Sequence, residues 1–190
     1  DGLDARNWAA RPNRIEVLRK ALSGKGGVIR KALAETAALD MTPQTLPGPT
    51  GESNRLAMYP KGSVLCLGPT LDIAIAQAAQ ALGTGCAAVI VAPGAEQAVK
   101  PLIDAGVPVA GLDGSVSAET VSEVKGIAAV AAAGNSDWTR ELRIALAKRD
   151  GAIVPLETQT ISPDRYVVER HLCIDTTAAG GNASLLATAE

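Results

Sequence analysis

The sequence predicts an α/β fold in which helices cover both faces of a parallel sheet. Short, continuous apolar runs alternate with helical patterns from about residue 62 to residue 156. Such runs are typical of strands that are buried on both faces of a sheet. The 190 residues are enough for one ordinary core, and an alanine-rich composition without Phe favours helices packed closely on a sheet.

The N-terminal segment, residues 1–41, is expected to be helical. Apolar spacing predicts two helices within residues 12–40, joined by a loop at Ser23–Gly27. The Gly-Lys-Gly-Gly of this loop invites comparison with a phosphate-binding loop. A plain turn is favoured, because no strand precedes it and the phosphate-loop spacing is absent. Residues 42–58 hold three prolines and two glycines at 42–51 and predict a linker loop.

Residues 59–157 carry the α/β pattern itself. Apolar runs predict strands, and the segments between them have helical spacing. The expected strands are 62–68, 86–92, 107–112 and 127–133, followed by the apolar stretch 151–156, and the expected helices are 70–82, 95–105, 117–123 and 138–148.

The C-terminal region departs from this pattern. Alternating β-formers on both sides of Ser162–Asp164 predict a projecting β-hairpin at 158–174. No helix is left to cover this hairpin, so it is expected to pair with another sheet or another domain, including a second copy of the chain. Residues 175–190 form a glycine-hinged tail that either docks on a neighbouring surface or begins a helix capped by Asn182.

Charge and cysteine content narrow the classes of function. A net charge of −2 argues against a nucleic-acid or anionic-membrane surface. No run of eighteen apolar residues occurs, and the start is not a signal peptide. Cys66 and Cys86 lie in apolar runs, as expected of core residues in a reduced, cytoplasmic protein, and no cysteine has metal-ligand spacing. A chain that begins at Asp1 is expected to be part of a longer protein.

Four segments resemble, in order, the NAD-binding half of the aldehyde dehydrogenase superfamily. Residues 60–69 resemble its first strand, 76–93 its "ALAAGN-x-VV-x-KP", 101–108 its "L-x-x-AG-x-P" and 130–135 its "V-x-FTGS". The resemblance implies a Rossmann-like sheet of the aldehyde dehydrogenase type.

Two further segments are similar to the C-terminal region of the proline utilisation A family: "LPGPTGESN" at 46–54 and "ERHLCIDTTAAGGNASLL" at 169–186. This resemblance implies a bifunctional parent enzyme, with an FAD-dependent proline dehydrogenase and an NAD-dependent glutamate-semialdehyde dehydrogenase. It also implies that this domain is non-catalytic, packs on the dehydrogenase domain and seals the substrate-channelling tunnel with its tail. The tail contacts would come from Asp175, Thr176, Thr177, Gly180, Gly181, Asn182, Leu185 and Leu186.

Positions that bind the dinucleotide in that superfamily are altered here. Ala92 falls at the lysine of "KP", and an alanine cannot donate a hydrogen bond to ribose. The phosphate-binding turn falls at Gly134–Thr139, where Thr139 replaces a glycine, Trp138 adds bulk, and Asp137 would repel phosphate or cap the next helix. Glu157 falls at the general base and is expected to be a surface carboxylate. No cofactor is therefore expected in this domain, although a degenerate NAD-binding module and a stand-alone interaction module stay open.

The catalytic thiolate of an aldehyde dehydrogenase is carried by a separate domain after the NAD-binding half. Here the chain passes from Leu156 into the expected hairpin, so this nucleophile is not expected in the domain. Cys173, two residues from His171, is expected to be buried or to lie at an interface.

Overall fold

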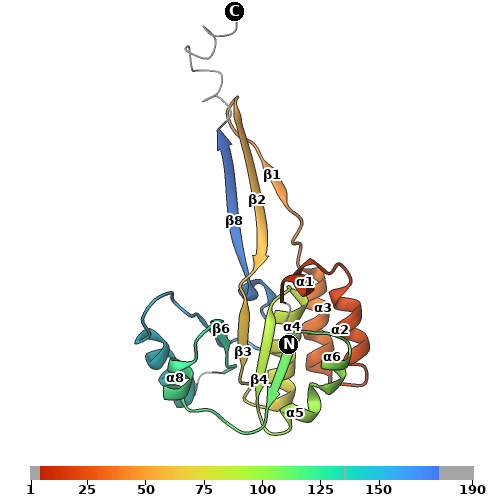
Figure 1. Cartoon of the computed structure of the whole chain (residues 1–190), viewed down its shortest axis with the longest axis vertical. Coiled ribbons are helices and arrows are strands. Elements are labelled where there is room, and N and C mark those ends of the chain that lie inside the picture. Colours follow the sequence, from red (N-terminus) through yellow and green to blue (C-terminus); the bar gives the residue numbers. More distant parts are fainter. Residues whose placement is uncertain (1–4, 135, 176–190) are drawn as a thin grey trace, which may run out of the picture. The chain divides into compact units, whose positions relative to one another are not determined.

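The structure of the chain is a computed structural model that describes residues 5–134 and 136–175 (Figure 1). The described residues form two compact units. The first contains residues 5–39 and 60–167, and the second contains residues 40–59 and 168–175.

The first unit is built on a five-stranded parallel sheet with the strand order β5-β4-β3-β6-β7. Val64 of the central strand pairs with Ala88 on one side and Ala129 on the other. The predicted α/β class is thereby confirmed. The strands are β3 (Ser63–Cys66), β4 (Ala87–Val91), β5 (Val109–Leu112), β6 (Ile127–Ala131) and β7 (Leu156–Glu157).

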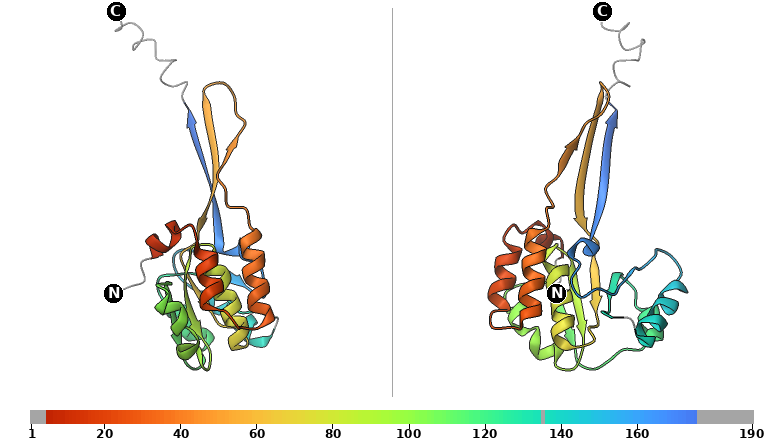
Figure 2. Two further views of the ribbon diagram at one scale, coloured as in Figure 1. Left: turned by 90° about the vertical axis from the view of Figure 1, so that its right-hand side faces the viewer. Right: turned by 180° about the vertical axis from the view of Figure 1, so that it is seen from behind.

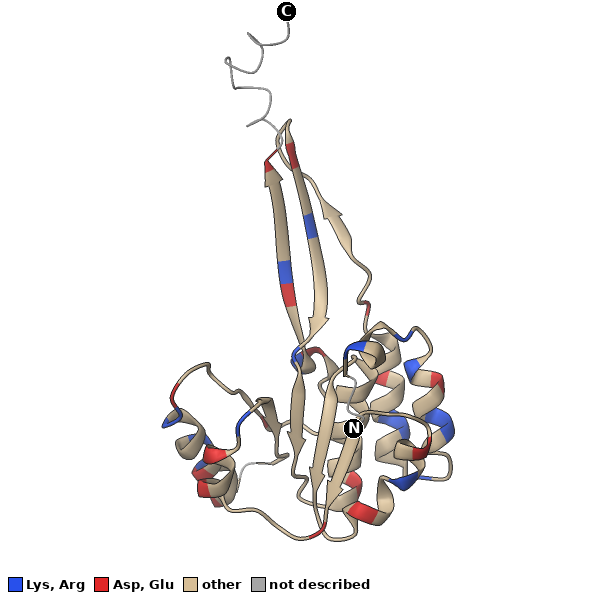
Figure 3. Ribbon diagram, viewed as in Figure 1, with Lys and Arg blue, Asp and Glu red and all other residues tan. Residues whose placement is uncertain are grey.

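Alternate side chains of β3, and of Leu67 directly after it, belong to two separate hydrophobic cores. Val64 and Cys66 face the core on the side of α4, whereas Leu65 and Leu67 face the core on the side of α7 and α8. The strands β3 to β6 carry no charged residue, as expected for strands covered on both faces (Figure 3). The helices are α1 (Ala5–Ala10), α2 (Arg14–Ala21), α3 (Gly27–Ala38), α4 (Leu71–Gly83), α5 (Ala95–Ala98), α6 (Lys100–Asp104), α7 (Ala118–Glu123) and α8 (Asp137–Ala147).

The N-terminal helices belong to the core of this unit. Helices α2 and α3 lie beside α4 (Figure 2), and the loop between them is the expected turn, with Gly24 at a φ of 81°. The indole Nε1 of Trp8 donates to the carbonyl of Leu82 at 2.8 Å, and Trp8 is buried. No helix among the described residues has the length and apolarity needed to cross a membrane.

Residues 158–166 are part of the first unit, where they pack against α4, and do not form half of a hairpin. The buried side chain of Gln80 donates to the carbonyl of Thr160 at 2.8 Å and accepts from the amide of Ser162 at 2.6 Å. A 3₁₀ helix, η1 (Pro163–Tyr166), follows, and Tyr166 is buried. The predicted hairpin turn at Ser162–Asp164 is therefore wrong, because α4 supplies polar partners to this backbone.

The second unit is a three-stranded sheet with the order β1-β2-β8. Its strands are β1 (Gln44–Leu46), β2 (Glu52–Pro60) and β8 (Val167–Asp175), and β1 and β2 are antiparallel. The loop expected at 42–58 thus contains two strands, because its prolines 47 and 49 and Gly51, with a φ of 93°, lie in the turn that joins them.

Cross-strand side-chain pairs hold β8 beside β2 in this sheet. The Nε2 atom of His171 is 3.1 Å from Oδ1 of Asn54, and the guanidinium of Arg170 lies 5.0 Å from the ring centre of Tyr59. The strand that pairs with β8 is therefore β2, which lies more than a hundred positions earlier in the chain, and not the first arm of the hairpin expected at 158–174.

Candidate functional site

A pocket of about 680 Å³ opens at the carboxyl edge of the first unit's sheet. Open α/β sheets bind ligands at this edge, at the topological switch point, where the chain turns from building one side of the sheet to building the other beside its first strand. Here β3 is that strand, with β4 on one side and β6 on the other. The pocket is lined by Leu67, Pro69, Val91, Ala92, Pro93, Gly114, Ser115, Val116, Ser117, Ala118, Ser136, Trp138 and Glu141.

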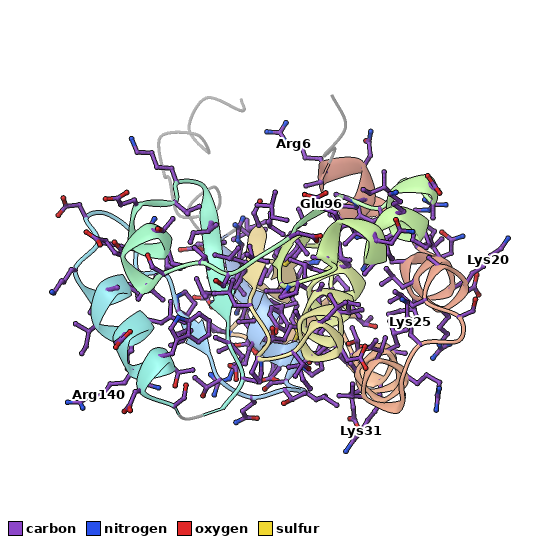
Figure 4. The ribbon with its side chains drawn as sticks, turned by 90° about the horizontal axis from the view of Figure 1, so that it is seen from below. Arg6, Lys20, Lys25, Lys31, Glu96 and Arg140 are labelled. Atoms are coloured by element: carbon purple, nitrogen blue, oxygen red, sulfur yellow. The ribbon has the colours of Figure 1, made fainter. Side chains whose placement is uncertain are left out.

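The pocket lining is mostly apolar, with three serines, and contains no cation. Among the described residues that form it, Glu141 alone is charged. The neighbouring Arg140 is exposed and points away from the fold (Figure 4). The pocket therefore offers a phosphate group no cationic side chain, and the donors left to consider are the backbone amides at the helix N-termini.

Side-chain hydroxyls accept hydrogen bonds from backbone amides at the N-terminus of α8, beside this pocket. The amide of Thr139 donates to Oγ of Ser136 at 3.3 Å, and Oγ1 of Thr139 accepts from the amide of Ser136 at 2.9 Å. This capping box satisfies two backbone amides within the helix itself. The cap is Ser136, so the expectation that Asp137 caps the helix is wrong; Asp137 is its first residue.

Of the other three helices that begin near this edge, α4 and α7 each have a single side-chain cap, whereas α5 begins at Gly94 without one. Oγ1 of Thr70 accepts from the amide of Ile73 at 3.4 Å, and Oγ of Ser117 accepts from the amide of Thr120 at 3.1 Å. Ser117, Ser136 and Glu141 are not among the expected site residues. A hydroxyl residue directly before a helical pattern, as at Ser117 and Ser136, is the usual signal for a cap.

Ala92 and Gly134, two positions expected to have lost dinucleotide contacts, differ in their relation to the pocket. Ala92 lines the pocket, and its methyl group offers no polar contact. Gly134 has a φ of 104°, and its amide donates to the carbonyl of Thr158 at 2.9 Å, but it is not among the lining residues.

Glu157 lies on β7, away from this pocket lining. Its Oε1 accepts from the amide of Gln159 at 2.8 Å, and its Oε2 lies 3.6 Å from Nε of Arg165. Only 14% of the side chain is exposed, so the prediction of a surface carboxylate is wrong. The backbone turn after β7 and the guanidinium hold this carboxylate in place.

The cysteines occupy contrasting environments. Cys66 and Cys86 are buried as expected, and burial raises the pKa of both thiols. Cys173 is exposed on β8. Of the two environments expected for it, burial within the described residues is therefore wrong, and a place at an interface stays a prediction. No group of three His, Cys, Asp or Glu side chains in the described part of the chain is placed to hold a metal ion.

Of the expected tail contacts, Asp175 is the last described residue and lies exposed at the end of β8. The others lie outside the described residues: Thr176, Thr177, Gly180, Gly181, Asn182, Leu185 and Leu186.

Comparison with known sequences finds relatives among long bacterial proteins. No protein-family model matches the chain. It is 36% identical over 188 residues to the bifunctional protein PutA of Escherichia coli (strain K12). The matched region is 95% of this chain and 13% of that protein. It is 35% identical over 150 residues to PutA of Salmonella typhimurium, and this match covers 76% of this chain and 11% of that protein. The chain thus spans about an eighth of the length of these relatives.

Solved structures agree with the sequence relatives. A mutant of Bradyrhizobium japonicum proline utilization A superposes with a TM-score of 0.66 at 26% identity, covering 80% of this chain and 20% of that one. A NAD-dependent benzaldehyde dehydrogenase from Corynebacterium glutamicum superposes with a TM-score of 0.67 at 19% identity, covering 80% of this chain and 42% of that one, and shows the shared fold. The chain therefore belongs to the PutA family, as a relative of one segment of these longer proteins, with the α/β fold that aldehyde dehydrogenases share.

Proposed function

We propose that the chain is a non-catalytic structural domain of a bifunctional enzyme that oxidises proline to glutamate in the cytoplasm. The observation that carries the proposal is the chemistry of the pocket at the carboxyl edge. A dinucleotide would bring two phosphates there, and the described lining offers one carboxylate and no Lys or Arg. The capping box at Thr139 also leaves fewer free amides for a phosphate.

The described thiols support a non-catalytic role. Aldehyde oxidation needs an accessible thiolate beside the substrate. Cys66 and Cys86 are buried and their pKa values are raised, so they stay protonated. Cys173 is exposed, but on strand β8, where the neighbouring His171 contacts Asn54.

The second unit supports a role in packing against another domain. β8 is an edge strand of its sheet, and Val168, Leu172 and Ile174 are exposed on alternate positions of it. An exposed apolar edge strand favours pairing with a further strand. Its partner in this proposal is the dehydrogenase domain of the parent chain, or the same unit of a second copy.

The tail completes the proposal. Residues 175–190 would lie over the passage through which the semialdehyde moves between the two active sites, with Asp175 at the point where β8 ends. A reactive intermediate is lost unless its path is shielded from water. The parent enzyme would use FAD and NAD in its other domains, and this domain would bind neither.

The test is a truncation of the parent enzyme that removes residues 175–190. Coupled conversion of proline to glutamate should fall, whereas proline dehydrogenation measured with an artificial electron acceptor should be retained. A second variant, Leu172→Asp on β8, should weaken assembly, and Ile153→Asp is its control, because Ile153 is 94% exposed in the first unit. Unchanged coupled activity in the truncation would remove the basis for a tunnel-sealing role.

A second candidate is a dinucleotide-binding regulatory module, which the size and position of the pocket favour. Calorimetric titration with NAD separates the two functions. Binding in the micromolar range that Trp138→Ala alters would establish the module, and absence of heat would support the structural role.

A further inference from the structure

We propose a binding site for a small monocarboxylate in a second, smaller pocket of the first unit, beside Glu157. The pocket has a volume of about 260 Å³ and is lined by Lys61, Ala129, Pro155, Leu156, Glu157, Thr158, Gln159 and Arg165. A single water molecule takes about 30 Å³ of liquid, so the pocket has room for a carboxylate and several waters.

Lys61 is a partly buried cation that lacks an acidic partner. Its Nζ atom donates to the carbonyl of Arg165 at 2.6 Å, which fixes the ammonium at the pocket wall. No carboxylate of the described residues forms an ion pair with it. A partly desolvated ammonium with one neutral acceptor has donors left for an anion.

Arg165 brings a second cation to the same pocket. Its Nε atom lies 3.6 Å from Oε2 of Glu157 and 3.8 Å from Oδ2 of Asp164. Both described ion pairs thus involve Nε of the guanidinium. The two terminal nitrogens form a fork that fits the two oxygens of a carboxylate. Lys61 and Arg165 are 104 residues apart in sequence, and the fold brings them together through the bond between Nζ and the Arg165 carbonyl.

The charge balance selects the class of anion. The lining carries two cations and one carboxylate, and therefore a net charge of +1. Asp164, 3.8 Å from Nε of Arg165, lies outside this lining, and because 62% of its side chain is exposed, water screens its charge. A monocarboxylate neutralises the net charge of the lining, whereas a phosphate dianion would leave excess negative charge facing Glu157, which is held in place by the amide of Gln159. The site is separate from the pocket at the ends of β3 and β4 and does not depend on the function proposed above.

The test is a titration of the chain with sodium acetate, followed by amide chemical shifts in NMR spectra at constant ionic strength. Resonances of residues 157–165 should shift and saturate. Lys61→Met and Arg165→Gln should each weaken binding about tenfold, since each removes a charge-assisted hydrogen bond. Lys100→Met is the matched control, because Lys100 is exposed and outside the pocket, and it should leave the affinity unchanged.

A variant that should bind acetate more tightly distinguishes loss of the site from misfolding, because a misfolded protein would only lose affinity. Glu157→Gln removes the one negative charge of the lining and should tighten acetate binding about threefold. Equal shifts with sodium chloride and acetate, or weaker acetate binding in Glu157→Gln, would overturn the proposal. Much tighter binding of glycine than of acetate, lost in Glu157→Gln, would also overturn it, because the ligand would then be a zwitterion whose ammonium needs this carboxylate.

Discussion

Gly83 of α4 and Thr36 of α3 are in such close contact that the glycine leaves no room for a side chain. A Cβ atom placed on Gly83 would lie 2.7 Å from Cγ2 of Thr36 and 2.9 Å from Cδ1 of Ile15. Thr36 cannot easily turn away, because its hydroxyl donates to the carbonyl of Ala32 at 2.7 Å. This contact sets how closely the N-terminal helices approach the helix that covers the sheet.

We therefore predict that Gly83→Ala lowers the free energy of unfolding by about 1–3 kcal/mol, as overpacking usually does. Urea unfolding followed by circular dichroism measures this. Adding Thr36→Ser, which removes Cγ2, should restore part of the loss. Gly27→Ala is the control, since the nearest atom to its new Cβ is the end of the Arg30 side chain at 3.8 Å. Independent, additive effects of the Gly83 and Thr36 changes would show that the contact does not limit packing.

Gln80 is predicted to fix the segment 160–162 on the first unit. Gln80→Leu leaves the Thr160 carbonyl and the Ser162 amide without their partner and should cost about 2 kcal/mol. Hydrogen exchange should quicken at Ser162 more than in β3. The exposed Gln97 provides the control substitution, Gln97→Leu. If exchange at Ser162 is unchanged, the bond does not hold this segment.

The thiols should react in two classes. The exposed Cys173 should react with a disulfide reagent such as DTNB within minutes, whereas the buried Cys66 and Cys86 should react only after unfolding. Cys173→Ser should abolish the fast phase. A fast phase that persists in Cys173→Ser would mean that one of the two core thiols becomes accessible in the native protein.

Alkaline pH should destabilise the first unit. Burial raises the pKa of Cys66, Cys86 and Tyr166 in the folded state. In the unfolded chain a cysteine ionises near pH 8.5 and a tyrosine near pH 10. The unfolded state thus loses protons that the folded state keeps, and stability falls as the pH rises through these values. Urea unfolding between about pH 7.5 and 10 should show this decline, and Cys86→Ala should reduce its slope. A flat profile would contradict the burial of these groups.

The α/β class and the strands and helices between residues 63 and 147 follow from the sequence alone, except that the helix expected at 95–105 is divided into α5 and α6. The loss of dinucleotide binding at Ala92 and Thr139 stays a prediction from the same local patterns. These features depend on local patterns, because buried strands need continuous apolar runs and a methyl group cannot donate a hydrogen bond. The relationship to the PutA family also follows from local motifs, which lie in the right order along the chain.

Tertiary structure decided the contacts between distant residues. β8 pairs with β2 rather than with residues 158–166, because α4 already binds that segment through Gln80. The tertiary structure also buries most of the Glu157 side chain and brings Nζ of Lys61 to the backbone carbonyl of Arg165. Such pairings depend on which surfaces the folded chain brings together, and no local pattern of residues specifies them.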